Sequence, residues 1–389
     1  MHKAKGFFVT LAIAGLSLGA PPALAADRES LDARFQQAKP VACDVQCGDV
    51  ITQHTKLTHD LSCPGLNEPA LRVEGDGIVL DLGGYTVRRS GPDQGGTSGI
   101  VVTSGSYMVR NGTIRGFDRG IQTFGTNNLR LHELTFADNF IAVFNLVGNA
   151  FLVTDSRFIG NTIGFTSGFE VPTGTLDVRS SHFENNGSAI IMNSLIADVL
   201  DSTFTSNGVT LDCFNGRARV RSSVLTRNQV VARAIDPAGQ PNICGILRFE
   251  DSLFTNNTSF GPADAPVWVP TQLDMINNLL VGNGSGLEVA TLTTYVQGNT
   301  FWNNAGGLTL SDYPNAFIPL TGIVRANQFL RNDGDGLRVL PPSTPTVIGN
   351  VALGNTGWGI HAPTAFDGGG NVARDNGAGN CEGIVCAPY

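Results

Sequence analysis

One residue in each successive segment of the chain occupies an equivalent position, a few residues after a recurring Asn. In chain order these residues are Gln122, Phe144, Thr166, Ile191, Asp212, Arg233, Trp268, Glu288, Thr309, Arg338 and His361. Charges of both signs beside a Trp are typical of a binding surface and uncommon in a core. We call this series the outward row, because each member lies between apolar residues that are expected to point inward.

The outward row has the side chains that recognition of an acidic sugar requires. Trp268 offers an aromatic plane to the apolar face of a sugar ring, and Arg233 or Arg338 can bind a uronate carboxylate through paired hydrogen bonds. We expect Arg233, Arg338 or His361 to be the catalytic base or electrophile, because histidine titrates near neutral pH and arginine stabilises developing negative charge.

The two acidic members of the row, Asp212 and Glu288, are candidates for a second catalytic role. They would bind a cation or orient the substrate during the same reaction. A solvated pair is the alternative, since Asp212 and Arg233 in neighbouring segments would stabilise each other by under about 1 kcal/mol.

Insertions cluster around the same positions. Residues 169–173, 236–242 and 312–318 interrupt the repeat just after the row, and residues 261–266 interrupt it just before. Insertions on one side of a repeat protein often mark its binding face. We therefore expect loops that wall a groove, with Asp236 and Asp264 as substrate-binding residues. His132 and His182 fall on the other strand of each segment and are predicted to face away from this groove.

A short phrase repeats from about residue 134 onwards: Ser or Asn, any residue, a large apolar residue, two more residues, then Asn. The final Asn recurs at intervals of roughly 21 to 29 residues, which is typical of a solenoid. The positions are Asn139, Asn161, Asn186, Asn207, Asn228, Asn257, Asn283, Asn304, Asn332, Asn355 and Asn376. Stacked Asn side chains can bond from coil to coil, and Asn tolerates the left-handed backbone of a sharp corner.

The apolar position of the phrase predicts a continuous core, with Phe158, Phe183 and Phe204 stacked one above another. Alternating runs such as Gly286-Leu-Glu-Val289 read as strands with one buried face. With the Asn ladder and the Ser/Asn row, these features resemble the secreted right-handed parallel β-helix proteins, the architecture of pectate lyases. The resemblance covers about residues 70 to 380 and implies an all-β right-handed parallel β-helix solenoid of roughly 11–13 coils.

The ends of the chain predict export and capping. Residues 1–25 have the charged start, apolar stretch and small-residue cleavage site of a signal peptide. Residues 26–69 are expected to form an N-terminal cap and lead-in segment, with a short amphipathic helix at 29–38. Residues 70–389 would form the β-helix and a C-terminal cap. We expect a secreted, periplasmic or cell-surface protein, most simply a monomer, without a transmembrane segment. The net charge of −8 argues against a nucleic-acid partner.

Seven Cys in an exported protein indicate disulfides. We predict Cys47 with Cys63 and Cys381 with Cys386, which would staple the two ends. A third pair, Cys213 with Cys244, lies near neighbouring coils, although spacing alone does not distinguish a bridge from two buried thiols. Cys43 is left unpaired.

Metal and hydrolytic signatures are weaker. The run Asn332-Asp-Gly-Asp-Gly336 resembles part of a Ca²⁺ loop, so Asp333 and Asp335 are candidate ligands, although the distal Glu is missing and Asp-Gly is also a common turn. A glycosidase needs two carboxyl groups within about 5 to 10 Å. Asp212 and Glu288, three coils apart, would be separated by roughly 14 Å. The sequence contains neither the polygalacturonase motifs nor the Asp-Pro-His-Asp of alginate epimerases.

Three functions remain open. The leading hypothesis is a polysaccharide-active lyase or epimerase that acts on a uronate-containing glycan. The second is a non-catalytic surface or matrix protein that binds glycans or other proteins along its long face. The third is a glycoside hydrolase. The missing enzyme motifs favour the second hypothesis, whereas the clustered insertions and mixed charges favour an active site.

Overall fold

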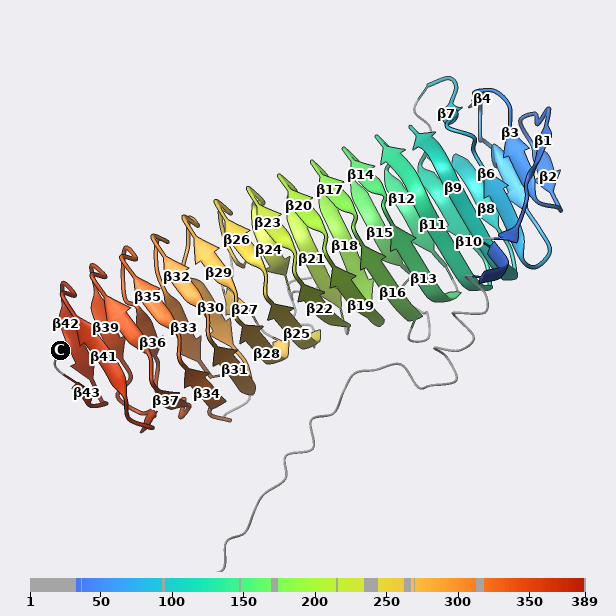
Figure 1. The fold of residues 1–389 in the computed structure, drawn as a ribbon. Coiled ribbons are helices and arrows are strands. Elements are labelled where there is room, and N and C mark those ends of the chain that lie inside the picture. The colour runs from blue at the N-terminus through green and yellow to red at the C-terminus, as the bar shows by residue number, and fades with distance from the viewer. Residues whose placement is uncertain are drawn as a thin grey trace, which may run out of the picture. The chain divides into compact units, whose positions relative to one another are not determined.

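The computed structural model describes residues 33–35, 37–92, 95–146, 148–168, 174–214, 216–233, 244–261, 267–268, 270–312 and 318–387. The chain divides into two compact units, Met1–Ala38 and Lys39–Tyr389. The described residues of the first unit form a single helical turn at 33–35 and 37, inside the segment predicted to be helical. The second unit is a stack of coils built from parallel strands (Figure 1).

The predicted solenoid is confirmed, with about 14 turns. All named strand pairs are parallel, and each strand pairs with its equivalent one coil away (Figure 1). The turn count exceeds the predicted 11–13 because strands of the lead-in segment, beginning at Val41, already pair within the sheets.

Three faces run along the solenoid. Face 1 contains β1 (Val41–Cys43), β3 (Thr55–Leu57), β6 (Ile78–Asp81), β9 (Gly105–Arg115), β11 (Thr126–Ala137), β13 (Gly148–Thr154), β16 (Gly174–Arg179), β19 (Leu195–Leu200), β22 (Arg217–Arg221), β25 (Cys244–Glu250), β28 (Pro270–Ile276), β31 (Thr293–Gln297), β34 (Thr321–Arg325), β37 (Thr346–Ile348) and β40 (Phe366–Asp367).

Face 2 carries the repeated phrase. The long strands β9 and β11 extend into it, and its other strands are β4 (Leu61–Cys63), β7 (Thr86–Arg89), β14 (Arg157–Ile159), β17 (His182–Glu184), β20 (Thr203–Thr205), β23 (Val224–Thr226), β26 (Leu253–Thr255), β29 (Leu279–Val281), β32 (Thr300–Trp302), β35 (Gln328–Leu330), β38 (Val351–Leu353), β41 (Asn371–Arg374) and β43 (Cys386–Ala387).

Face 3 carries the outward row and consists of two successive sheets. The first contains β2 (Asp49–Ile51), β5 (Leu71–Val73), β8 (Ser98–Val102), β10 (Arg119–Thr123), β12 (Ile141–Asn145), β15 (Ile163–Ser167), β18 (Ser188–Asn193), β21 (Val209–Phe214) and β24 (Val230–Arg233). The second contains β27 (Val267–Trp268), β30 (Leu287–Ala290), β33 (Leu308–Ser311), β36 (Leu337–Val339), β39 (Trp358–His361) and β42 (Gly379–Glu382).

The Asn ladder lines one buried corner, as predicted. Nδ2 of Asn186 donates to Oδ1 of Asn207 at 3.0 Å and to the carbonyl of Phe158 at 2.9 Å. Its own Oδ1 accepts the backbone N–H of Asn161 at 3.1 Å. We expected the left-handed backbone conformation at the ladder Asn itself. The residue before it has this conformation instead, for example Asn185 with φ 54°. The ladder side chain can therefore turn inward and satisfy the buried corner.

The apolar ladder fills the interior. The rings of Phe158 and Phe183 stack at 4.4 Å between centroids, and those of Phe183 and Phe204 at 4.9 Å. All three side chains are fully buried. Offset stacking of aromatic rings adds to the stabilisation from the area they bury. The core is therefore a continuous column, with each coil packing only on its neighbours.

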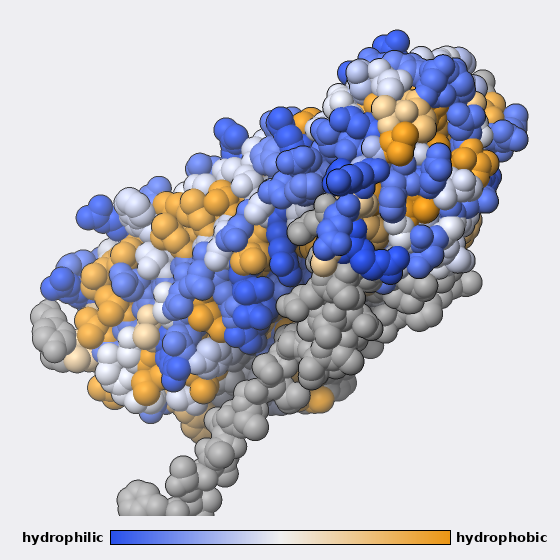
Figure 2. All heavy atoms as spheres, turned by 45° about the vertical axis from the view of Figure 1, so that its right-hand side comes forward, coloured by the Kyte–Doolittle hydropathy of each residue, from blue (hydrophilic) through white to orange (hydrophobic). Residues whose placement is uncertain are grey.

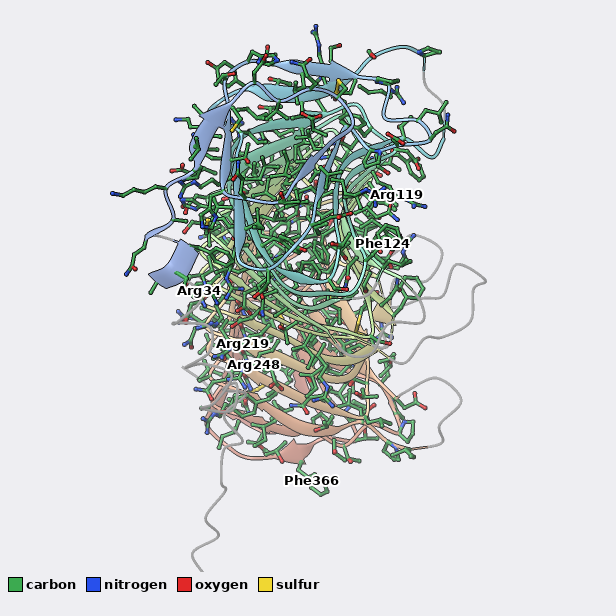
Figure 3. All side chains as sticks on the ribbon, turned by 90° about the vertical axis from the view of Figure 1, so that its right-hand side faces the viewer. Arg34, Arg119, Phe124, Arg219, Arg248 and Phe366 are labelled. Atoms are coloured by element: carbon green, nitrogen blue, oxygen red, sulfur yellow. A yellow bond between two sulfur atoms is a disulfide. The ribbon has the colours of Figure 1, made fainter. Side chains whose placement is uncertain are left out.

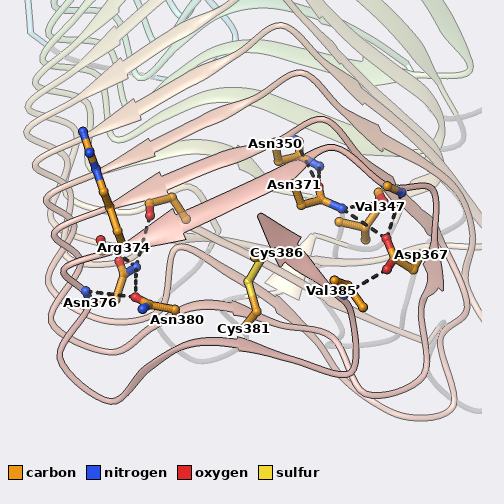
Figure 4. Close-up of a disulfide and its surroundings, with 12 residues drawn as sticks. Val347, Asn350, Asp367, Asn371, Arg374, Asn376, Asn380, Cys381, Val385 and Cys386 are labelled. Atoms are coloured by element: carbon orange, nitrogen blue, oxygen red, sulfur yellow. Dashed lines mark hydrogen bonds between the residues drawn. A yellow bond between two sulfur atoms is a disulfide. The ribbon is translucent and has the colours of Figure 1, made fainter. Parts of the chain in front are cut away.

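The three predicted disulfides are present. The Cα atoms are 5.5 Å apart in Cys47–Cys63 and in Cys213–Cys244, and 6.2 Å apart in Cys381–Cys386. Cys43 is half-buried and free. The last bridge closes the C-terminal turn (Figure 4). Among the described residues, no helix is long and apolar enough to span a membrane.

Candidate functional site

Most of the outward row is in register, but Gln122, Thr166 and Asp212 are buried, so the prediction that the whole row faces solvent is wrong at these positions. Strand pairing aligns Gln122, Phe144, Thr166, Ile191, Asp212 and Arg233 in sequence on the first sheet of face 3. A second run aligns Glu288, Thr309, Arg338 and His361 on the second sheet. The strand following each ladder Asn therefore forms one continuous series in each sheet.

The predicted register of Trp268 is wrong. Val267 pairs with Glu288, and Trp268 pairs with the buried Val289, so Trp268 is one residue out of phase with the row. The first sheet instead continues through a bridge between Val230 and Ser259. The insertion before Trp268 sets the phase of the strand after it, and counting along the sequence did not reveal that shift. Asp236 and Asp264 lie outside the described residues.

Asp212 and Arg233 form a tight pair between neighbouring coils. Nε of Arg233 donates to Oδ1 of Asp212 at 3.0 Å, and a second guanidinium nitrogen contacts Oδ2. The Asp212 side chain is 1% exposed. Burial raises the pKa of the Asp212 carboxyl, and the hydrogen bonds and charge of Arg233 offset only part of this rise. A buried carboxylate satisfied in this way favours a structural role over cation binding.

The C-terminal coils bring Arg338 and His361 side by side. Nε2 of His361 lies 3.2 Å from the Glu382 carboxylate, and the Trp358 ring stacks on the imidazole at 5.7 Å between centroids. Arg338 also lies 3.9 Å from Asp335. A histidine oriented by a carboxylate and placed beside an arginine has the groups that proton transfer next to a uronate requires.

The proposed cation ligands Asp333 and Asp335 do not converge. The Asp333 carboxylate accepts the Thr356 hydroxyl at 2.9 Å, and the Asp335 carboxylate accepts the backbone N–H of Trp358 at 2.7 Å. Each carboxylate therefore accepts a hydrogen bond from the next coil. In the described part of the chain, no three His, Cys, Asp or Glu side chains gather as metal ligands. These residues do not fit the predicted calcium site.

Sequence reasoning missed a cluster of buried charges on face 1. We call Arg219, Arg248, Glu250, Gln272 and Asp274 the face 1 cluster. Strand pairing stacks Arg219 on Arg248 and Arg248 on Asp274. Glu250 is 7% exposed and Asp274 is 5% exposed. Figure 3 shows Arg219 and Arg248 projecting together from one side of the solenoid, with Arg119 and Phe124 on the opposite side.

Arginine contacts hold both carboxylates of the cluster. Nε of Arg219 donates to Oε2 of Glu250 at 2.9 Å, while Arg248 contacts Oε1. The Arg248 guanidinium also lies 3.5 Å from Oδ2 of Asp274. Nε2 of Gln272 donates to Oδ1 of Asp274 at 3.0 Å. One guanidinium therefore bridges two carboxylates that lie on adjacent strands.

The environment shifts the pKa values of these two carboxyls in opposite directions. Burial raises the pKa of Asp274, and the hydrogen bond from Gln272 and the charge of Arg248 offset the rise only in part. Burial alone would also raise the pKa of Glu250, but hydrogen bonds and charges from Arg219 and Arg248 outweigh it and lower that pKa. A pair separated in this way is the usual pattern of a catalytic acid beside an ionised partner.

Polar side chains continue along face 1 beyond the cluster. Tyr295 follows Asp274 in the same row, and its hydroxyl contacts Gln297. Arg325 lies over the Tyr295 ring at 5.4 Å and donates to Gln297 at 2.6 Å. An extended polar row parallel to the solenoid axis suits a linear polymer. The signal was present in the sequence, because Asp177, Asp198, Arg219, Arg248 and Asp274 recur before successive phrases.

The fold places the chain in a class, the all-β parallel β-solenoids. No protein-family model matches the sequence, and no curated protein matches it significantly. The interpretation of its function therefore depends on the side chains of the solenoid itself.

Proposed function

We propose that this protein is a polysaccharide-active enzyme and that the face 1 cluster is its active site. The observation that carries the proposal is the pair Glu250 and Asp274, two buried carboxyls on adjacent strands with oppositely shifted pKa values. Asp274, with the raised pKa, is the proton donor. Glu250, held ionised by two arginines, is the base.

The pair supplies the two carboxyl groups that hydrolysis of a glycosidic bond requires. Arg248 is in register with Asp274, so Glu250 lies one strand across and two residues along. This offset separates the two Cα atoms by roughly 8 Å. Between the two carboxyl groups lies the Arg248 guanidinium, which contacts Oε1 of Glu250 and lies 3.5 Å from Oδ2 of Asp274, so hydrolysis at this pair requires Arg248 to move aside and admit a water molecule.

Hydrolysis at this pair would proceed by a single displacement. Asp274 would protonate the glycosidic oxygen while Glu250 takes a proton from a water molecule, whose oxygen attacks the anomeric carbon. The bond between that carbon and the glycosidic oxygen breaks, releasing two shorter chains. Exposed arginines on the same face, Arg217 and Arg325, would attract a uronate-containing polymer.

A second candidate reaction is β-elimination or epimerisation of a uronate, which the Arg338, His361 and Glu382 arrangement favours. His361, oriented by Glu382, would remove the proton next to the carboxylate, and Arg338 would stabilise the charge that develops. Arg338 and His361 are neighbours in register, which places both groups within reach of one sugar unit.

The proposal also includes an exported monomer with the right-handed winding of the pectate-lyase-like β-helix proteins and with residues 26–69 as the cap. Three disulfides support export, because such bonds form and persist in oxidising compartments. Size-exclusion chromatography with light scattering tests the monomeric state.

Incubation with a panel of uronic-acid polymers and neutral glucans distinguishes the reactions. New reducing ends without an unsaturated product indicate hydrolysis, and absorbance from a conjugated uronate indicates elimination. We expect Asp274→Asn and Glu250→Gln each to lower the rate by about 100-fold or more. The control Asp138→Asn changes a carboxylate outside this row, which is paired with Arg115 at 2.7 Å in an early coil, and should retain activity. Polymer binding without turnover would instead favour a non-catalytic matrix protein.

A further inference from the structure

A hollow lies at the corner that follows face 2 in the C-terminal coils and contains none of the residues of the face 1 cluster. Its volume is about 550 Å³, and it is lined by Trp302, Leu330, Arg331, Leu353, Gly354, Arg374 and Asp375. We call it the C-terminal groove. Four of these residues, Trp302, Leu330, Leu353 and Arg374, are successive partners in the strand ladder. The groove therefore runs parallel to the solenoid axis over four coils, about 14 Å.

A missing side chain helps to form the hollow. Arg331, Gly354 and Asp375 occupy the same corner position in successive coils, all with positive φ. Gly354, at φ 65°, lies between the two charged residues, and a Cβ added there would come no closer than 3.6 Å to Arg331. A larger residue is therefore accommodated sterically and would fill the space. Asn is accepted at this corner elsewhere in the chain, at Asn256 and Asn303.

The lining combines an aromatic plane with two cations. The Trp302 side chain is 46% exposed, and Leu330 and Leu353 are half-buried beside it. Figure 2 shows hydrophobic patches toward both ends of the solenoid, the C-terminal end included, with more hydrophilic surface over its middle. An exposed indole with aliphatic neighbours suits the apolar face of a sugar ring.

The two arginines of the groove are free to bind an anion. Arg331 and Arg374 have no ion-pair partner among the described residues. By contrast, Arg115, in the same outward position of an early coil, is paired with Asp138 at 2.7 Å. Figure 4 shows the Arg374 side chain extending away from the Cys381–Cys386 bridge. Two coils, or roughly 10 Å, separate the two arginines along the groove.

We infer that the C-terminal groove is a binding site for an anionic polysaccharide and anchors the chain on which the face 1 cluster acts. One sugar ring stacks on Trp302, and carboxylate or sulfate groups of the following units pair with Arg331 and Arg374. The polymer role rests on the proposed function, whereas binding in the groove requires no catalysis. Paired contacts between guanidinium and carboxylate or sulfate give the site its preference for anionic units.

Affinity electrophoresis in gels containing alginate, polygalacturonate or chondroitin sulfate tests this inference, with hydroxyethylcellulose as the neutral polymer. The parent protein carries Asp274→Asn throughout, so that turnover does not alter the gel. Trp302→Ala and the filling change Gly354→Asn should each weaken retardation by about 10-fold or more, within the range of aromatic anchors. The double change Arg331→Ala with Arg374→Ala should remove the dependence of binding on salt.

Arg115→Ala is the matched control, because it removes an exposed arginine from the same row and should leave retardation unchanged. Circular dichroism confirms that each variant is folded. Unaltered mobility of both Trp302→Ala and Gly354→Asn, equal retardation by the neutral polymer, or no retardation of the parent by any anionic polymer would overturn the inference. If the groove variants lose polymer binding but, with Asp274 restored, still turn over short substrates, the result supports the groove as a binding site and is consistent with the face 1 cluster as the active site. Binding without any turnover would refute only the proposed enzyme activity.

Discussion

Replacing one Asn of the ladder by Asp exchanges a side-chain nitrogen for an oxygen. This change tests whether directional hydrogen bonds between the amides stabilise the solenoid. Asn207 is fully buried, and its Nδ2 donates to Oδ1 of Asn228 and to the carbonyl of Phe183, both at 3.0 Å. Its Oδ1 accepts the backbone N–H and Nδ2 of Asn186, also at 3.0 Å. Asn207→Asp keeps the shape of the side chain and the two hydrogen bonds that Oδ1 accepts. It replaces the donor Nδ2 by an oxygen, which then faces two acceptors, Oδ1 of Asn228 and the carbonyl of Phe183.

The cost follows from those contacts. Each buried acceptor that loses its donor costs about 1–3 kcal/mol, and the introduced charge is buried without a cation. We expect Asn207→Asp to lower the free energy of unfolding by roughly 3–5 kcal/mol at pH 7. When protonated, the introduced carboxyl donates one of the two lost bonds, and the cost falls to about 1–3 kcal/mol.

The difference between those costs, about 2 kcal/mol, corresponds to a folded-state pKa raised by about 1.5 units. Because the pKa is higher in the folded than in the unfolded state, the recovered stability is fully present below about pH 4 and is lost as the pH rises through about 5.5. Guanidinium unfolding followed by circular dichroism between pH 4 and 7 measures this profile.

Asn185→Asp is the matched control, one residue away at the exposed corner. Asp already occupies that corner with positive φ at Asp138 and Asp375, so the change should cost less than about 0.5 kcal/mol at any pH in the range. Equal losses for the two variants, or a pH-independent loss for Asn207→Asp, would refute the account of the ladder as a chain of directional amide bonds.

Phe204→Ala should lower the free energy of unfolding by about 3–5 kcal/mol because the stacked column cannot close the void, whereas the half-exposed Thr203→Ala should cost under about 1 kcal/mol; similar losses would show that the inward assignment is wrong. Backbone hydrogen bonds from Val385 and Gly369 lower the pKa of Asp367. The contribution of the ionised Asp367 carboxylate to folding stability is therefore present above about pH 4 and is lost as the pH falls further. Hydrogen exchange at those two amides should therefore be faster in Asp367→Asn at neutral pH and indistinguishable from the parent in strong acid. Arg219→Gln should raise the pKa of Glu250 and shift the acidic limb of the activity profile upward, and an unchanged profile would argue against Glu250 as the base.

The ladders were the most predictable part of the fold, because each depends on residues that repeat at one position of every coil. The phrase placed Asn161, Asn186 and Asn207 in one corner, and the structure confirms this with hydrogen bonds of 3.0 Å between their side-chain amides. The disulfides were also predictable, since pairs near the ends and in neighbouring coils satisfy the short Cα distances that a bridge needs.

The candidate site was less predictable for two physical reasons. Trp268 follows an insertion, and an insertion can change which face a strand residue takes, because side chains alternate with a period of two. The buried pair Glu250 and Asp274 was overlooked because only the strand after each ladder Asn was considered. The same row-by-row reading of the preceding strand would have aligned Arg248 with Asp274.

The sequence by itself determined the architecture of this protein, because a repeated pattern of inward apolar residues and corner amides can be satisfied only by stacking coil on coil. The tertiary structure decided which charges meet. Residues such as Arg219, Glu250 and Asp274 lie tens of positions apart in the chain, and their pKa values depend on burial and on partners in neighbouring coils. The repeat aligns such residues in one row, but only the packed coils decide how deeply each carboxylate is buried and which arginine contacts it.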